Sequence, residues 1–293
     1  MRIIRYLKAL SSVQLAAVTD EGEIFNLPQG DFLSLLKEAE ASAASPLALV
    51  QSLISSARPI PESLEQLSLL VPIEAPEVWA AGVTYERSRE ARNYEATGGR
   101  MDASTFYDKV YDAERPELFF KSTAARTVGP GGAVQLRSDS SWQIPEPELA
   151  LVLDGRGRIV GYTIGNDMSC RDIEGENPLY LPQAKVWKRS CSIGPAIRLA
   201  ETVEDPYRLQ MTCRIYREGQ KVVEGTASTG QLKRKLEELT GFLKRDNELF
   251  EGTVLLTGTC IVPPNEFTLA AGDRVEIDIS GIGTLLNPVV SAS

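Results

Sequence analysis

From residue 78 onward, the chain is divided into short apolar segments that are separated by turns containing glycine or proline. Apolar runs of about four to eight residues with this punctuation are typical of β-strands, because helices are usually longer. The segments are residues 78–83, 118–120, 133–136, 149–153, 159–164, 210–216, 254–256 and 275–279. The pattern predicts an α+β fold that is mostly β-sheet.

The first 72 residues have a different organisation. Strand patterns come first and helical patterns follow, at residues 3–6, 13–18, 33–39, 47–54 and 64–69. Asp31 can cap the first of these helices, because its carboxylate accepts from free backbone N–H groups of the first turn. Prolines between residues 59 and 76 mark the exit from this segment. We therefore predict a small N-terminal α/β domain over residues 1–72 and a catalytic domain over residues 73–293.

Helical patterns interrupt the strands of the larger domain at three places. Two are polar stretches, at residues 86–92 and 104–111. The third repeats leucine at helical spacing, with Lys and Glu between the leucines, at Leu232, Leu236, Leu239 and Leu243. We expect this amphipathic helix to cover the core rather than to bind a partner.

The bulk composition excludes several classes of protein. The 293 residues carry a formal net charge of −9 and contain no block rich in Lys or Arg, which argues against a nucleic-acid partner. No apolar run approaches the length of a membrane span. The four cysteines form no C-x-x-C pair, and no signal peptide precedes them. We therefore expect reduced thiols and a cytoplasmic location.

Histidine is absent from the whole sequence. This absence excludes catalysis by Ser-His-Asp or Cys-His groups, zinc bound by histidine, and any histidine general base. Acid–base chemistry in this chain must therefore use carboxylates, lysine, tyrosine, cysteine or water bound to a metal.

Two glutamates flank a proline at the point where a strand pattern begins. Glu146 and Glu148 are two residues apart, so on an extended backbone their side chains point to the same face. Pro147 has no backbone N–H, which favours the start or the edge of a strand. Beyond the glutamates, the same face continues with Ala150 and Val152. On spacing alone, such a pair would most often be a solvated strand edge.

A third carboxylate changes that interpretation. Residues 154–158 form a turn, and the return strand 159–164 leads to Asn166 and Asp167. In an antiparallel hairpin, the end of the second strand lies beside the start of the first, so Asp167 is expected beside Glu146 and Glu148. Three converging carboxylates repel one another unless a cation lies between them, which predicts a site for a hard divalent cation.

Three cationic residues near these acids are further candidates. Arg171 could bind a substrate carboxylate with two hydrogen bonds, or could form a structural pair with Asp172. Lys185 lies among apolar and aromatic residues, and Lys121 follows a similar segment. A buried lysine near a metal can transfer protons, although a lysine considered alone is more often at the surface.

Several separated motifs resemble the fumarylacetoacetate hydrolase family. They are Pro-Glu-Pro-Glu-Leu-Ala at 145–150, Gly-Tyr-Thr-Ile-Gly-Asn-Asp-Met-Ser-Cys-Arg-Asp at 161–172, Lys185, Gly-Pro at 194–195, and segments 256–259, 272–275 and 281–289. The resemblance covers roughly residues 78 to 290. It implies a catalytic domain that is a mixed β-sandwich roll, and a homo-oligomer, either a dimer or a tetramer. It also implies Mg²⁺, or alternatively Mn²⁺ or Ca²⁺, with substrates that are 2-keto acids and with the ligands Glu146, Glu148 and Asp167.

One departure from the family pattern bears on the reaction. Hydrolases of this family share a G-x-N-Y-x-x-H segment, but here Ser88 stands where the histidine would be and Ala91 where its glutamate partner would be. The segments around residues 82–92 and 115–121 instead resemble the branch of 2-keto-3-deoxy-pentonate dehydratases. That resemblance implies Glu117 and Lys185 as the acid/base pair, with Glu114 as a competitor for Glu117. It implies substrate binding by Ser88, Arg87, Lys121, Arg171 and Thr259.

The chemistry of dehydration suits a chain without histidine. A metal that chelates a 2-keto acid acidifies the adjacent methylene, and a general acid then assists the departure of the neighbouring hydroxyl, so no activated water is needed. The leading hypothesis is therefore a dehydratase that forms 2,5-dioxopentanoate. One alternative is a hydrolase or decarboxylase of a diketo acid such as an acylpyruvate, with Glu86 or Glu90 as the base. Another is a binding protein without catalytic activity.

Overall fold

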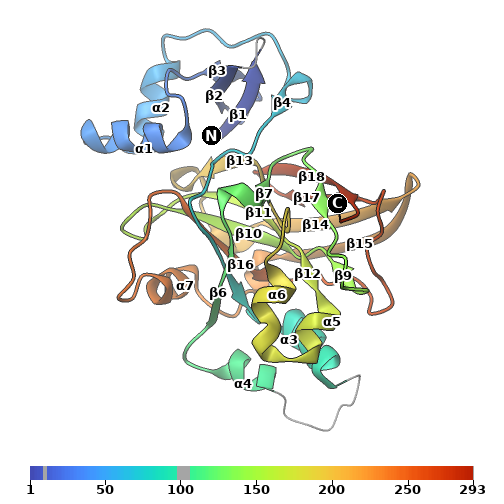
Figure 1. The fold of residues 1–293 in the computed structure, drawn as a ribbon. Coiled ribbons are helices and arrows are strands. Elements are labelled where there is room, and N and C mark those ends of the chain that lie inside the picture. Colours follow the sequence, from blue (N-terminus) through green and yellow to red (C-terminus); the bar gives the residue numbers. More distant parts are fainter. Residues whose placement is uncertain (9–11, 98–105, 293) are drawn as a thin grey trace.

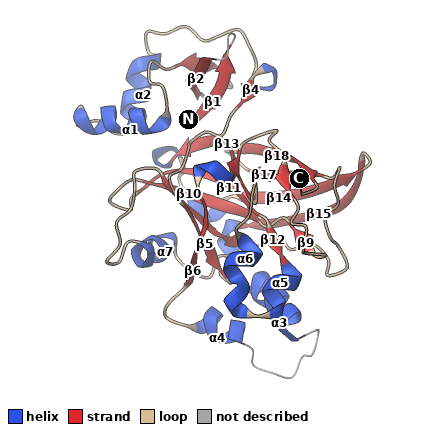
Figure 2. Cartoon of the chain, in the orientation of Figure 1, coloured by secondary structure: helices blue, strands red, loops and turns tan. Residues whose placement is uncertain are grey.

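The computed structural model describes residues 1–8, 12–97 and 106–292. A large β-sheet packs against a smaller one, and the helices lie around the two sheets (Figures 1 and 2). The mostly β architecture that the sequence predicts is confirmed. None of the helices in these described ranges has the length and apolar character that crossing a membrane requires.

The large sheet has eleven strands and contains both chain segments that form the candidate site. Nine strands follow one path, in the order β3 (Ile24–Asn26), β2 (Ser12–Val18), β1 (Arg2–Lys8), β13 (Cys191–Leu199), β11 (Ile159–Asp167), β10 (Pro147–Leu153), β16 (Thr253–Thr259), β5 (Val78–Gly82) and β6 (Glu117–Ser122). Two short strands are added at its sides: β4 (Ser68–Leu69) pairs with β1, and β7 (Thr127–Val128) pairs with β13.

The smaller sheet and a two-stranded ladder complete the β-structure of the described residues. The smaller sheet has five strands, in the order β15 (Gln220–Ser228), β14 (Gln210–Arg217), β17 (Arg274–Ile279), β18 (Gly283–Val290) and β8 (Val134–Gln135). The ladder joins β9 (Gln143–Ile144) to β12 (Ser169–Cys170).

Seven α-helices are found in the described part of the chain. They are α1 (Phe32–Ala41), α2 (Pro46–Ile54), α3 (Glu86–Thr97), α4 (Phe106–Asp112), α5 (Arg171–Glu176), α6 (Leu181–Lys185) and α7 (Leu236–Leu243). Asp31 caps α1 as expected, because its carboxylate accepts from Ser34 N–H at 2.7 Å. Figure 1 shows α3, α5 and α6 grouped at the opposite end of the large sheet from α1 and α2.

Two helical predictions are wrong in their extent. Leu232 is not part of the amphipathic helix, because it has an extended backbone after the 3₁₀ turn Thr229–Gln231, and α7 begins one turn later. The predicted helix at 64–69 is a 3₁₀ turn, Leu64–Gln66, followed by strand β4. Pairing of β4 with β1 supplies the tertiary contact that local sequence does not show. Residues 104 and 105 of another predicted helix lie outside the described residues.

Strand β10 shows how the two faces of the large sheet are used. Leu149, Leu151 and Leu153 join a core that includes the strands of the smaller sheet. Ala150 and Val152 join a second core that includes α1 and α2. Because side chains alternate along a strand, Glu148 lies on the face of Ala150 and Val152, as the sequence predicts. The carboxylate therefore extends an apolar face rather than a wet edge, and it is 1% exposed.

The first strands of the chain belong to the same sheet as the candidate site. Arg2 and Ile3 of β1 pair with Arg198 and Ile197 of β13, so the N-terminal segment extends the large sheet. The blue N-terminal elements in Figure 1 nevertheless stand together at one end of the molecule. The division into domains at residues 1–72 and 73–293 stays a prediction.

Candidate metal centre and active site

Three buried carboxylates meet at the open end of the β10–β11 hairpin. One oxygen from each of Glu146, Glu148 and Asp167 lies within 4.8 Å of the other two. The strand register explains this meeting, because Pro147 pairs with Asn166 and the Asp167 N–H donates to the Glu146 carbonyl at 2.9 Å. The predicted convergence of the three side chains is confirmed, while their role as metal ligands remains a prediction for each residue.

Two buried lysines lie against these carboxylates. Lys121 Nζ is 2.5 Å from Asp167 Oδ1. Lys185 Nζ is 2.6 Å from Glu146 Oε2 and 3.3 Å from Asp167 Oδ2. The Lys185 ammonium also donates to Ser169 Oγ at 2.5 Å. Both lysines are almost completely buried, so their ion pairs are shielded from solvent and hold the carboxylates in place.

The pKa values of the three carboxylates are shifted in different directions, because nearby positive charge stabilises their ionised forms to different extents. Burial raises the pKa of Glu148 well above its ordinary value, and the negative charges of Asp167 and Glu146 raise it further. Burial also raises the pKa of Glu146, although Lys185 opposes the shift. Burial opposes ionisation of Asp167 too, but Lys121 and Lys185 hold the pKa of Asp167 below its usual range. Glu148 is thus the carboxylate that the protein alone neutralises least.

The donor set of the site fits a hard divalent cation. The carboxylates of the cluster are five, Glu117, Glu146, Glu148, Asp167 and Glu174, and its cationic side chains are three, Lys121, Lys185 and Arg92. When all eight groups are ionised, the cluster has a net charge of two negative charges. A divalent ion between the carboxylates would balance both charges. Carboxylate oxygens are the ligands that Mg²⁺ prefers, so the residues present suit this ion.

The last residues of β16 orient Glu148. The backbone N–H of Gly258 donates to Glu148 Oε2 at 2.6 Å. Gly258 has a φ of +97°, and a Cβ at this position would overlap the Thr84 hydroxyl. Only glycine satisfies both the positive φ and the close approach. The position of one expected ligand therefore depends on backbone geometry of a neighbouring strand.

Glu117 enters the same site from β6. It pairs with Gly82 of β5, and a Cβ at Gly82 would overlap the Glu117 carboxyl. Glu117 Oε2 is shielded from water and has no hydrogen-bond partner. Burial raises the pKa of Glu117, while the charge of Arg92 opposes the rise. A carboxyl with a raised pKa and an unpaired oxygen is suited to exchange protons near neutral pH.

Helix α3 forms one wall of a narrow cavity over the carboxylates. Ser88 and Arg92, one helical turn apart, line this cavity together with Phe119 and the three carboxylates. Ser88, which replaces the family's histidine, therefore lies at the site. Its Oγ donates to the Tyr85 carbonyl at 2.8 Å. Its side chain is 7% exposed.

Buried ion pairs join α3 to α5. Arg92 Nη1 pairs with Glu174, and Glu95 pairs with Arg171, all with little solvent exposure. Arg171 also lies over the Trp142 ring at 5.6 Å. The structure therefore pairs Arg171 with Glu95 rather than with Asp172, whose carboxylate accepts from Ser140 and Ser141.

The remaining expected substrate-binding residues are placed in different ways. Thr259 lines the cavity, but its hydroxyl donates to the Pro147 carbonyl at 3.0 Å. Lys121 is buried behind Asp167. Arg87 is exposed on α3 and pairs with Glu90 at 3.3 Å, so its guanidinium does not line the cavity. The substrate-binding roles of all these residues remain predictions.

Sequence reasoning missed three charged residues that the structure brings to this region. They are Arg92, Glu95 and Glu174. The spacing of Arg92 and Glu95 on one polar helix was visible in the sequence. Their burial was not visible, because it depends on the packing of α3 against α5, which no local pattern encodes.

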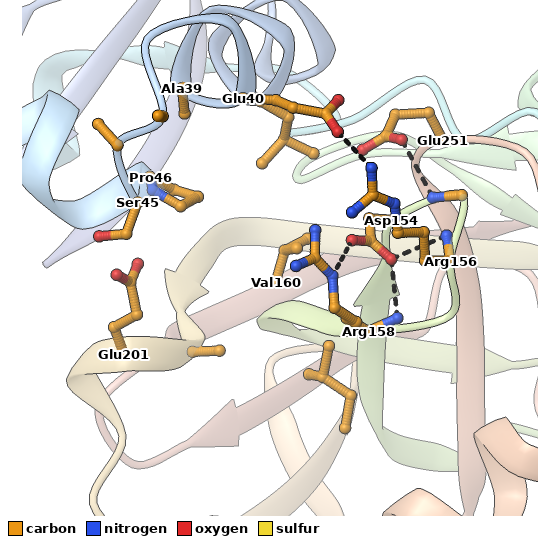
Figure 3. A pocket seen from close by; sticks show the side chains of 16 residues that line it. Ala39, Glu40, Ser45, Pro46, Asp154, Arg156, Arg158, Val160, Glu201 and Glu251 are labelled. Carbon is orange, nitrogen blue, oxygen red and sulfur yellow. Dashed lines mark hydrogen bonds and ion pairs between the residues drawn. The ribbon is translucent and has the colours of Figure 1, made fainter.

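A second cavity, of about 700 Å³, lies between α1–α2 and the β10–β11 turn (Figure 3). Its carboxylates already have partners: Asp154 accepts from Arg158, and Glu40 pairs with Arg156. None of the three clustered carboxylates lines it. We therefore place the chemistry in the narrower cavity, where the perturbed carboxyls and buried lysines converge.

Comparison with known proteins agrees with this geometry. Residues 87–290 match the family model described as fumarylacetoacetate (FAA) hydrolase C-terminal. The chain belongs to the fumarylacetoacetate hydrolase family.

Two relatives match this family member over nearly their whole length. The probable 2-keto-3-deoxyxylonate dehydratase of Haloferax volcanii is 44% identical over 288 residues, which cover 97% of this chain and 98% of that protein. The 2-dehydro-3-deoxy-D-arabinonate dehydratase of Saccharolobus solfataricus is 42% identical over 293 residues, with 99% and 96% covered.

A solved structure extends the comparison to a bound state. The 2-keto-3-deoxy-D-arabinonate dehydratase complexed with magnesium and 2,5-dioxopentanoate is 38% identical, with a TM-score of 0.85. The alignment covers 100% of this chain and 99% of that one. The neighbour therefore shares the fold of the whole described chain, and its ion matches the one that the carboxylate cluster here suits.

The charge imbalance at Glu148 makes a prediction for the variant Glu148→Gln. Without divalent ions, its melting temperature should be no lower than that of the unchanged protein, because a poorly neutralised buried carboxylate is removed while the amide oxygen still accepts from Gly258. Saturating Mg²⁺ should stabilise the unchanged protein by about 2.7 kcal/mol at roughly 100 times Kd, and the variant by much less. Thermal melting in EDTA and in Mg²⁺ measures both effects.

Glu21→Gln, at an exposed turn, is the matched control and should keep the full Mg²⁺ response. An undiminished Mg²⁺ shift in Glu148→Gln would remove Glu148 from the ligand set.

Proposed function

We propose that this protein is a magnesium-dependent dehydratase that converts a 2-keto-3-deoxy-pentonate to 2,5-dioxopentanoate. The observation that carries the proposal is the buried cluster of Glu146, Glu148 and Asp167, with Lys185 and Glu117 beside it and no histidine in the chain. The two relatives above 40% identity, both described as dehydratases of such acids, support the choice of substrate.

The metal centre supplies one part of the chemistry. Glu146, Glu148 and Asp167 would hold Mg²⁺, which would supply the Lewis acidity that makes the C3 protons of a 2-keto acid more acidic. The protein keeps the ligands in place through Lys121, Lys185 and the Gly258 N–H. Ala81, Val83 and Phe119 form the apolar part of the cavity wall.

Glu117 and Lys185 are the proposed proton carriers. Glu117 accepts a proton from C3, because its carboxyl has an unpaired oxygen and a pKa raised by burial. Although burial opposes its charge, Asp167 and Glu146 raise the pKa of Lys185 and keep it protonated, as a general acid must be before it donates. Its ammonium is the proposed proton donor to the departing C4 hydroxyl. Water is lost across C3 and C4. A proton then moves from C5 to C3, and the resulting enol becomes the C5 aldehyde.

The geometry gives little support to a hydrolase or decarboxylase of diketo acids. That reaction would need Glu86 or Glu90 as the base. Glu86 is 70% exposed and pairs with Arg89, and Glu90 is 53% exposed and pairs with Arg87. Neither lines the cavity above the carboxylates. Ser88, in the place of the family's histidine, cannot serve as a base at neutral pH.

Turnover by the purified protein is the direct test of the proposed function. With Mg²⁺ and either 2-keto-3-deoxy-D-xylonate or the L-arabinonate isomer, we expect formation of 2,5-dioxopentanoate, and we expect EDTA to abolish it. Product can be followed through its aldehyde by mass spectrometry. Absence of product from both substrates, or pyruvate release from an acylpyruvate instead, would contradict the proposal.

Two substitutions test the role of Glu117 by different routes. Glu117→Gln should lower kcat by about 100-fold or more, because general acid–base catalysis contributes at least that much. Gly82→Ala should also lower kcat strongly, since the three nearest atoms to the new Cβ all belong to the Glu117 side chain. Melting temperatures of both variants should stay close to that of the unchanged protein.

Gly241→Ala, where a Cβ would meet nothing within 4 Å, is the matched control and should keep full activity. If the single variants Gly82→Ala and Glu117→Gln both keep the wild-type kcat, Glu117 takes no part in proton transfer.

We also propose that the active form is a cytoplasmic homo-oligomer, either a dimer or a tetramer. The family resemblance supports this proposal. Light scattering on the purified protein distinguishes two or four chains from one.

A further inference from the structure

We infer that Arg92 binds the hydroxyl-bearing end of the substrate and that Glu174 holds the Arg92 guanidinium in position. The inference rests on the proposed dehydratase function and adds to it. It separates recognition of the sugar-acid tail from recognition of the 2-keto acid head, which the metal centre is proposed to hold.

Arg92 is built into the cavity wall rather than exposed on α3. Its side chain is 5% exposed and lines the same cavity as Lys185 and Glu148. Glu174, which is 1% exposed on α5, pairs with Arg92 Nη1 and lies 3.9 Å from Lys185 Nζ. Glu174 therefore links the guanidinium to the proposed proton donor. A buried pair of this kind fixes a side chain in one orientation.

Arg92 lies near both proposed proton carriers. Among charged groups, Arg92 has the strongest effect on the pKa of Glu117, after burial. At Glu146 its effect is weaker than those of Lys185, Asp167 and Glu174. In the structure, Glu174 Oε1 pairs with Arg92 Nη1 and lies 3.9 Å from Lys185 Nζ, so Arg92 lies on the side of the cavity where Lys185, the proposed proton donor to the C4 hydroxyl, is found. Since Lys185 is the proposed donor to the C4 hydroxyl, the substrate atoms nearest Arg92 are those of the hydroxyl-bearing end.

Three further polar side chains that line the cavity donate to protein groups. Ser88 donates to the Tyr85 carbonyl. Thr259 donates to a backbone carbonyl, and Lys185 donates to Glu146 and Ser169. Phe119 and the chain at 81–83 add apolar or backbone surface. A guanidinium carries five N–H donors in a planar fork, so Arg92 can pair with Glu174 and also donate to hydroxyl oxygens.

Comparison of two ligands tests the inference. Pyruvate has the 2-keto acid head but no hydroxyl, so it probes the metal centre alone. For Arg92→Gln, we expect the KM of the 2-keto-3-deoxy-pentonate to rise about 10- to 100-fold, as for a lost hydrogen bond to a charged donor. The inhibition constant of pyruvate should stay within about twofold of the wild-type value. Arg92→Lys keeps the charge and should recover part of the loss in KM.

Three further variants separate substrate contact from support of the helix. Arg89→Gln removes an arginine from the same helix, where Arg89 lies over Tyr111 instead of the cavity, and should leave both constants unchanged. Glu95→Gln breaks the other buried pair between α3 and α5, and should shift both constants together if it has any effect. Glu174→Gln should raise the substrate KM less than Arg92→Gln, again without affecting pyruvate.

The outcomes distinguish the inference from the function on which it rests. If the unchanged protein forms no 2,5-dioxopentanoate, the proposed function itself fails. If it turns over but Arg92→Gln leaves KM unchanged, or raises KM and the pyruvate constant in parallel, Arg92 does not recognise the tail and the inference is overturned. Should Arg92→Gln fail to fold, Arg92→Lys is judged by the same two constants.

Discussion

The enclosure of like-charged carboxylates between two buried lysines is the constraint on which the rest of the structure depends. Charges removed from water are unfavourable unless they are paired, and three carboxylates within 4.8 Å of one another repel strongly. Lys121 and Lys185 compensate for part of this repulsion, mostly at Asp167. The negative charge that the lysines leave uncompensated is greatest at Glu148, and a divalent cation at this site would compensate for it.

This constraint explains why the site is assembled from so many strands. The β10–β11 hairpin supplies the carboxylates, β6 supplies Glu117 and Lys121, and the end of β16 supplies the Gly258 N–H. Helices α3 and α5 then enclose the site through paired charges instead of apolar contacts alone. The proposed proton carriers, Glu117 and Lys185, are consequently held beside the carboxylate cluster by groups whose charges also shift their pKa values.

The parts of this arrangement that follow from local geometry could be predicted from the sequence. Alternation along β10 and the return of β11 were enough to bring Glu146, Glu148 and Asp167 together. The absence of histidine removed whole classes of mechanism. The inward orientation of Arg92, the outward orientation of Arg87 and the late start of α7 could not be predicted, because each depends on packing between elements that are distant in the sequence.

A crystal grown with Mn²⁺ and pyruvate would show whether the three carboxylates bind a divalent ion, because the anomalous signal of Mn²⁺ locates the ion independently of the protein coordinates. We expect one strong peak at about 2.0–2.6 Å from oxygens of Glu146, Glu148 and Asp167, with the pyruvate oxygens completing its coordination. At saturating Mn²⁺, a peak bound elsewhere, or the absence of a peak among these carboxylates, would contradict this expectation.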